Sequence, residues 1–175
     1  MSVKKMFTQY EQISGVWESD LETYSDEQLM KKPSSEEWSI GQVYAHLVMG
    51  SLQYHIKQIE LCLGYDANQN EKKTFPGTLM FFIQAFPPVR IKVPPSPTYT
   101  PQQPESREKI RAGMRLLRKK LQELSGEVDA ASHVGKTKHP ALGYLDAQEW
   151  FQLIVMHFRH HRLQKRRLDI FLKGM

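Results

Sequence analysis

The distribution of proline constrains the fold of this 175-residue chain more than any other feature. Eight of the ten prolines lie in the stretch "YDANQNEKKTFPGTLMFFIQAFPPVRIKVPPSPTYTPQQPES", residues 65–106. Because proline removes a backbone N–H donor and interrupts regular helices, this stretch is neither one helix nor a central strand. We expect "GTLMFFIQAF" to form a short helix or turn that packs on the rest of the protein. The proline-rich remainder is expected to run extended over the surface.

The segments on either side of this stretch have apolar residues at helical spacing. The spacing predicts four helices, over about Phe7 to Leu29, Ser39 to Gly64, Glu105 to Leu124, and Leu145 or Asp146 to Leu172. The order of these helices predicts an all-α fold, a four-helix bundle in which a long proline-rich crossover, residues 64–104, joins the second and third helices. We expect residues 1–175 to form a single domain, because this length suits one hydrophobic core.

Composition excludes several classes of protein. Apolar residues make up 40% of the chain and charged residues 25%, as in ordinary globular domains. No apolar run approaches the roughly 20 residues that cross a bilayer, and no secretory signal follows the N-terminal lysines. We therefore expect a cytoplasmic protein that has no membrane partner. The one cysteine, Cys62, cannot form an internal disulfide or a cysteine-built zinc site, and its apolar helical surroundings predict a packing role.

The net charge of +5 raises the alternative of a nucleic-acid partner. Its two densest stretches, residues 107–120 and 159–173, lie on predicted helices, where lysine and arginine can form a solvated face. No nucleic-acid recognition motif accompanies these stretches, so we expect no nucleic-acid partner. A basic surface also favours anionic small molecules.

Three of the seven histidines lie close together in the last predicted helix, within "WFQLIVMHFRHHRLQ". With a turn of about 100° per residue, His157 and His161 lie on the apolar stripe, whereas His160 points roughly 80° away from it. Two histidines four residues apart can chelate one metal ion, but a metal site needs a third ligand from a neighbouring helix.

His46, on the flank of the apolar stripe of the second predicted helix, is the leading candidate for that third ligand. His55 is expected at another level of the bundle, His139 is expected to pack in the loop before the last helix, and His133 lies in the same loop. Two interpretations remain open at this point. The histidines either hold one metal ion together, which would offset the cost of burying their polar nitrogens, or they are separate hydrogen-bonded core residues.

Two motifs resemble the DinB-like superfamily. "EEWSIGQVYAHL" resembles the tryptophan-serine start of the second helix in that family and ends in its ligand histidine. "HPALGYLDAQEWFQLIVMHFRHHRLQ" resembles the last-helix signature, with an HxxxH pair and a following glutamine. The resemblance implies one divalent ion, usually nickel, zinc or iron, held by His46, His157 and His161. It also implies a small-molecule substrate, for some members a low-molecular-weight thiol such as bacillithiol or mycothiol, and it implies that homodimers are common.

The expected activity is that of a metal-dependent thiol S-transferase or hydrolase. Three neutral nitrogen ligands leave coordination positions open, as in catalytic sites. The pair is not an HExxH motif, so the base of a metalloprotease is missing. Gln164 is a candidate for orienting a bound group, and Arg159 and Arg162 are expected to be solvated. The alternatives are a non-catalytic metal-binding stress or regulatory protein and a helical protein-interaction module.

Overall fold

The computed structural model describes residues 2–87, 100–131 and 135–174, and these residues are mostly helical. In chain order the elements are α1 (Val3–Leu21), α2 (Asp26–Met30), α3 (Ile40–Gly50), the π-helical segment η1 (Ser51–His55), α4 (Ile56–Gly64), α5 (Phe75–Ile83), α6 (Arg107–Ala130), β1 (Thr137–His139), β2 (Gly143–Leu145) and α7 (Ala147–Lys173). The predicted helical class is confirmed. Nowhere in the described ranges is a helix both long and apolar enough to cross a membrane.

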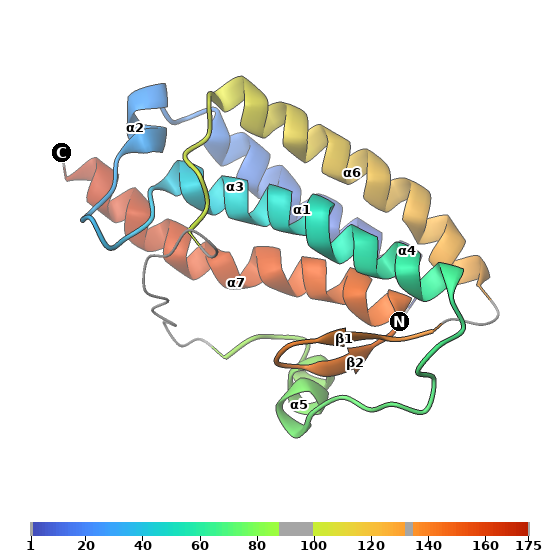
Figure 1. The fold of residues 1–175 in the computed structure, drawn as a ribbon. Coiled ribbons are helices and arrows are strands. Elements are labelled where there is room, and N and C mark those ends of the chain that lie inside the picture. Colours follow the sequence, from blue (N-terminus) through green and yellow to red (C-terminus); the bar gives the residue numbers. More distant parts are fainter. Residues whose placement is uncertain (1, 88–99, 132–134, 175) are drawn as a thin grey trace.

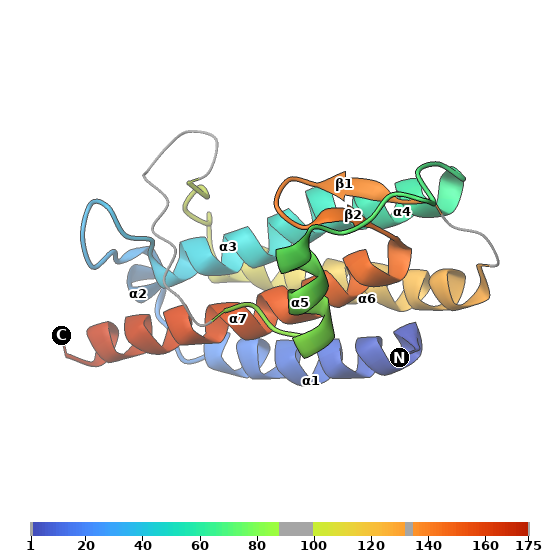
Figure 2. The same ribbon diagram turned by 90° about the horizontal axis from the view of Figure 1, so that it is seen from below.

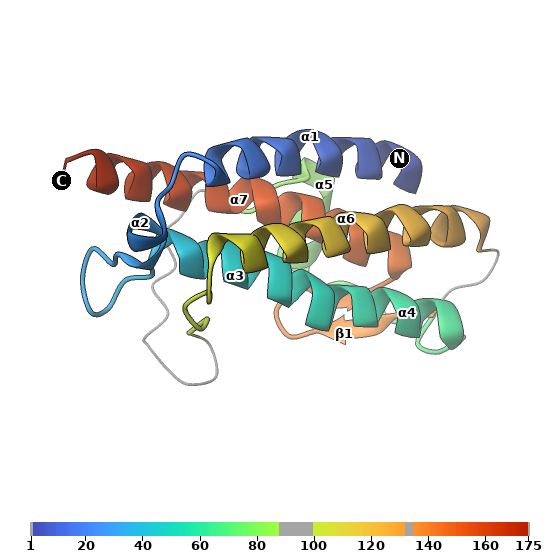
Figure 3. The ribbon, with the colours of Figure 1, turned by 90° about the horizontal axis from the view of Figure 1, so that it is seen from above.

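The long helices lie side by side (Figures 1 and 3). α1 packs against α6 and α7, and the continuous run α3–η1–α4 packs against the same two helices. α5 and the two strands lie outside this group, next to α7 and α4 (Figure 2). This arrangement leaves one side of α7 facing α3, and the histidines of both helices meet there.

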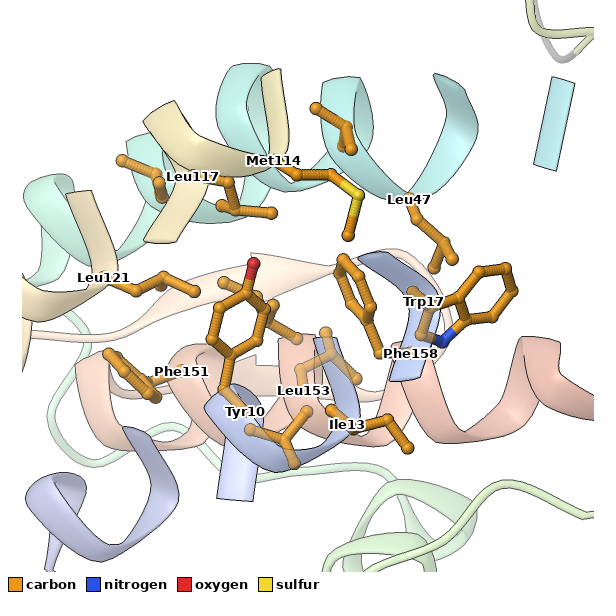
Figure 4. Close-up of a cluster of buried hydrophobic side chains, with 14 of the residues drawn as sticks. Tyr10, Ile13, Trp17, Leu47, Met114, Leu117, Leu121, Phe151, Leu153 and Phe158 are labelled. Carbon is orange, nitrogen blue, oxygen red and sulfur yellow. The ribbon is translucent and has the colours of Figure 1, made fainter. Parts of the chain in front are cut away.

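Large aromatic side chains fill the space between these helices. Tyr10 and Trp17 from α1 and Phe158 from α7 are fully buried and meet aliphatic side chains of α3 and α6 (Figure 4). The Trp17 ring makes edge contacts with Tyr44 at 5.1 Å and with Phe158 at 6.3 Å between centroids. Buried rings stabilise a fold through the apolar area that they remove from water. Edge-to-face pairs add about 0.5–1.5 kcal/mol each to this free energy.

The predicted start of the second helix is confirmed. The Ser39 hydroxyl accepts a hydrogen bond from the backbone N–H of Gln42, and the Gln42 side chain accepts one from the backbone N–H of Ser39. This reciprocal capping box satisfies N–H groups that a helix start otherwise leaves unpaired. It fixes the beginning of α3 and thereby the position of His46 along the helix.

The predicted first helix is interrupted at residues 22–25. α1 ends at Leu21, and α2 begins separately at Asp26, because Ser25 and Gln28 form a second capping box that starts a new helix. The third predicted helix is longer than expected and continues past Gly126 to Ala130. Its extension is explained by Val128, which is buried one turn after Leu124 and continues the apolar stripe.

A small antiparallel hairpin stands where the sequence predicts only a loop. β1 pairs with β2 so that Thr137 lies opposite Leu145. The hairpin supports α5, since the Thr74 hydroxyl caps that helix and donates a hydrogen bond to the Ala141 carbonyl. The expected short helix in "GTLMFFIQAF" is thus confirmed.

The proline-rich segment expected to run extended lies mostly in residues 88–99, outside the described residues, as does His133.

One lysine of the stretch that was expected to be solvated is buried. Lys165 is only 7% exposed, and its Nζ lies 2.8 Å from a carboxylate oxygen of Asp20 and 2.8 Å from one of Asp169. The ammonium also lies over the Tyr24 ring, whose hydroxyl donates a hydrogen bond to Asp169. The prediction of a solvated face is therefore wrong at Lys165, because two carboxylates from α1 and α7 compensate its charge.

Candidate metal centre

Three histidines from two helices bring their ring nitrogens together. His46 comes from α3, and His157 and His161 come from α7. The Nε2 atom of His157 lies 2.9 Å from Nε2 of His46 and 3.1 Å from Nε2 of His161. One ligand atom from each residue lies within 4.8 Å of the others, so the three could hold one metal ion.

Local sequence explains why these side chains converge. Asp146 caps α7 in a capping box with Glu149, which fixes the start of the helix that carries His157 and His161. On α3, Val43 and Leu47 are buried in the core, and His46 lies at the edge of their stripe, half-buried. The Trp38 ring, just before α3, packs on His46 with 5.1 Å between centroids.

Burial keeps all three imidazoles neutral at physiological pH. Desolvation lowers the pKa of His46 to about 4 and the pKa of His161 to about 3. Desolvation, followed by the neighbouring His161 and His46, also holds the pKa of His157 well below its ordinary value. A neutral imidazole offers a lone pair, which is the form that binds a metal ion.

Gln164 fixes the tautomer of one of these rings. The Nδ1 atom of His161 donates a hydrogen bond to Oε1 of Gln164 over 2.8 Å. With its proton on Nδ1, His161 presents a lone pair at Nε2, toward the other two histidines. A hydrogen bond to the far nitrogen of a ligand histidine is typical of metal sites, where it orients the ring and raises its basicity.

Hydrogen bonds between the three rings cannot account for both short contacts between their nitrogens. The Nε2 atom of His157 either donates to the lone pair of His161 or accepts from His46, and it cannot do both. One of the two short contacts is therefore left without a hydrogen bond. A cation would accept lone pairs from all three nitrogens. Nitrogens bound to one ion at about 2.1 Å lie about 3.0–3.4 Å apart, depending on the coordination angle, so the residues fit such an ion.

His55 lies nearer to this cluster than the sequence suggests. It was expected at another level, yet its ring centroid is 5.6 Å from that of His157. In a regular helix, nine residues at about 100° each would place His46 and His55 on opposite faces. The π-helical segment η1 takes up an extra residue and turns His55 back by about 100°. No local sequence pattern signals this π turn.

The other residues singled out from the sequence are not members of the cluster. His139 is the last residue of β1 rather than a loop residue, and its Nδ1 accepts hydrogen bonds from the backbone N–H groups of Ala141 and Leu142 in the hairpin turn. Cys62 is buried, and burial raises the pKa of its thiol, which agrees with a packing role. His160 points toward Phe86, with 5.4 Å between ring centroids. Within the described residues, no carboxylate belongs to the three-histidine cluster.

Comparison with known proteins supports the assignment suggested by these residues. The family model of the DinB superfamily matches residues 9–164, which include the three histidines and Gln164. Searches of curated proteins and of solved structures gave no match. Because the family model covers most of the chain, this protein belongs to the DinB superfamily.

Proposed function

We propose that this protein is a metal-dependent enzyme that acts on small electrophilic molecules, as a thiol-dependent S-transferase or as a hydrolase. The observation that carries the proposal is the convergence of three neutral imidazole nitrogens, 2.9 and 3.1 Å apart, from α3 and α7. Three nitrogen ligands leave coordination positions open, and open positions are characteristic of catalytic rather than structural metal sites.

The roles of the individual residues follow from their contacts. His46, His157 and His161 would hold the divalent ion, for which nickel, zinc and iron are the candidates. When bound, the ion would supply Lewis acidity that lowers the pKa of a thiol or water molecule beside it. Gln164 holds His161 in the tautomer that binds. The Trp38 ring packs on His46 with 5.1 Å between centroids and places an apolar surface beside the site.

The proposed cofactor is a low-molecular-weight thiol, and the proposed setting is the cytoplasm. Thiols remain reduced there, and the net charge of +5 favours an anionic thiol compound. Cys62 does not supply the nucleophile, because it is buried in the core and its thiol pKa is raised. The attacking thiol or water must therefore come from solution.

For the whole chain we propose a single four-helix-bundle domain of residues 1–175, with residues 64–104 as the crossover. The packing of α1 and of α3–α4 against both α6 and α7 supports this description.

We further propose a homodimer formed through α5, which exposes an apolar stripe at helical spacing: Phe75, Leu79, Phe82 and Ile83. Exposed apolar side chains gathered on one helix often mark interfaces. A Phe82→Glu variant should sediment as a monomer where the wild type sediments as a dimer, and a monomeric wild type would contradict the proposal.

Metal analysis is the first test of the proposed function. Protein purified without nickel resin should contain close to one divalent ion per chain, and His157→Ala should contain almost none. His160→Ala is the matched control, because His160 lies on the same helix and contacts the His161 ring but is outside the cluster. Equal, substoichiometric metal in all three proteins would overturn the metal site.

Activity is the second test. The metal-loaded protein should conjugate a low-molecular-weight thiol to an electrophile, or hydrolyse a small ester or amide, and His157→Ala should lose the activity. If the protein binds metal but supports no metal-dependent reaction across a panel of thiols and electrophiles, the enzyme is excluded. A non-catalytic metal-binding stress or regulatory protein then explains the site, and the lack of a carboxylate base in the cluster favours it as the second candidate.

A further inference from the structure

Two histidine nitrogens beside the proposed metal position are buried without a hydrogen-bond partner among the described residues. Nδ1 of His157 and Nδ1 of His55 have no hydrogen bond from any described residue, and the hydroxyl of Ser51 is in the same condition. Leaving a buried polar atom without a partner destabilises a fold, so three such atoms in one region require an explanation.

These groups come from neighbouring positions of the fold. Ser51 and His55 are the first and last residues of η1, about one π turn apart, and both are buried. The His55 ring meets the His157 ring at 5.6 Å between centroids, with an interplanar angle of 80°. The His55 ring also contacts the Trp150 ring, with 5.9 Å between centroids. The π turn thus brings a polar face of η1 against the metal-binding face of α7.

His157 requires a hydrogen-bond acceptor on the η1 side when it binds a metal ion. If Nε2 of His157 binds a metal ion, its single proton lies on Nδ1, and this buried N–H requires an acceptor. A neutral His55 with its proton on Nε2 can offer an acceptor lone pair at Nδ1. The two nitrogens form no direct hydrogen bond. One water molecule can bridge them, accepting from His157 and donating to His55, with the Ser51 hydroxyl as a further partner.

We propose that His55 is a positioning residue of the metal centre, which orients His157 through a hydrogen bond bridged by one buried water molecule. The proposal rests on the metal site proposed above. His55 does not touch the ion. It acts by holding the proton of His157 on Nδ1 and thus the lone pair on Nε2, as Gln164 does for His161. The π-helical segment is explained by the same requirement, since a regular helix would turn His55 away.

The test compares the metal affinities of three variants by competition with a chromophoric chelator, with Zn²⁺ as the probe. His55→Phe keeps a flat ring but removes both nitrogens, and it should weaken Zn²⁺ binding by about 10–100-fold. His55→Gln keeps a side-chain acceptor and should recover most of the affinity. His160→Phe is the matched control, because His160 contacts the His161 ring at 5.3 Å but has no unpartnered buried nitrogen, and its affinity should equal that of wild type.

Two further readouts separate positioning from folding. The thermal midpoint of metal-free His55→Phe should stay close to that of wild type, because the substitution keeps a buried ring and removes a nitrogen that has no direct protein partner. The visible spectrum of the Co²⁺-loaded protein should change in His55→Phe and return in His55→Gln. If wild type binds Zn²⁺ tightly and His55→Phe binds it equally well, the positioning role is overturned while the metal site stands. If wild type itself does not bind Zn²⁺, the proposed function fails first.

Discussion

Gln164 lies on α7 just past His161, and its Oε1 accepts a hydrogen bond from Nδ1 of His161 over 2.8 Å. Without this acceptor, His161 is free to place its proton on Nε2, where a metal ion would have to displace it. Gln164→Leu should therefore weaken metal binding by about 10-fold or more. Gln164→Glu keeps an acceptor oxygen and should bind at least as tightly as wild type. Zn²⁺ competition titrations decide the question, and equal affinities for the leucine variant and wild type would show that the hydrogen bond does not orient the ring.

Lys165 contributes to the stability of the fold through its contacts with two carboxylates. Lys165→Met removes the ammonium from between Asp20 and Asp169 and leaves two carboxylates close together. Breaking a fully buried ion pair costs about 3–5 kcal/mol. Because the Asp20 side chain is 37% exposed, solvent reduces the expected loss to about 2 kcal/mol. Urea unfolding measures it. Lys119→Met is the control, since Lys119 is 75% exposed and its unfolding free energy should change by less than about 0.5 kcal/mol.

At the scale of elements, the hairpin depends on Gly143. Its φ is +82°, and a Cβ there would lie 2.6 Å from the backbone nitrogen of Thr74. Gly143→Ala should therefore lower the thermal midpoint by several degrees, through strain in β2 and loss of its contact with the segment before α5. Gly15→Ala is the opposite case, because its Cβ would meet nothing within 4 Å in the middle of α1. It should raise the midpoint slightly, and a rise in both variants would contradict the close approach at Gly143.

The elements also show what sequence can and cannot predict. The capping box of Ser39 and the apolar stripe of α7 are encoded by neighbouring residues, so the start of α3 and the shared face of His157 and His161 were predictable. The convergence of His46 on that face was a hypothesis that the structure bears out. The π turn of η1 and the hairpin were not predictable, because tertiary packing decides them. The π turn brings the His55 ring closer to His157 than the helical spacing predicts, although His55 is outside the three-histidine cluster.

At the scale of the whole molecule, the buried histidines make stability depend on pH. In the unfolded chain each imidazole titrates near its ordinary pKa of 6.5, whereas burial lowers the pKa of His46 to about 4 and those of His55 and His161 to about 3. Below the ordinary pKa, the unfolded chain takes up protons that the folded chain excludes. The stability present above pH 6.5 is thus lost as pH falls toward these lowered values.

Metal-free protein should accordingly keep a constant thermal midpoint from about pH 8 to pH 7 and lose stability steeply between about pH 6.5 and pH 5, before most carboxylates titrate. Replacing His55 by Phe removes one of the responsible groups and should make the decline shallower, whereas His160→Phe should change it less, because His160 is only partly buried. Bound Zn²⁺ should raise the midpoint at neutral pH and lose this effect on acidification, since protons and metal compete for the same nitrogens. A flat midpoint across this range in the metal-free protein would mean that the folded chain accepts protons on these imidazoles, and the neutral, preformed donor set on which the metal site rests would then be wrong.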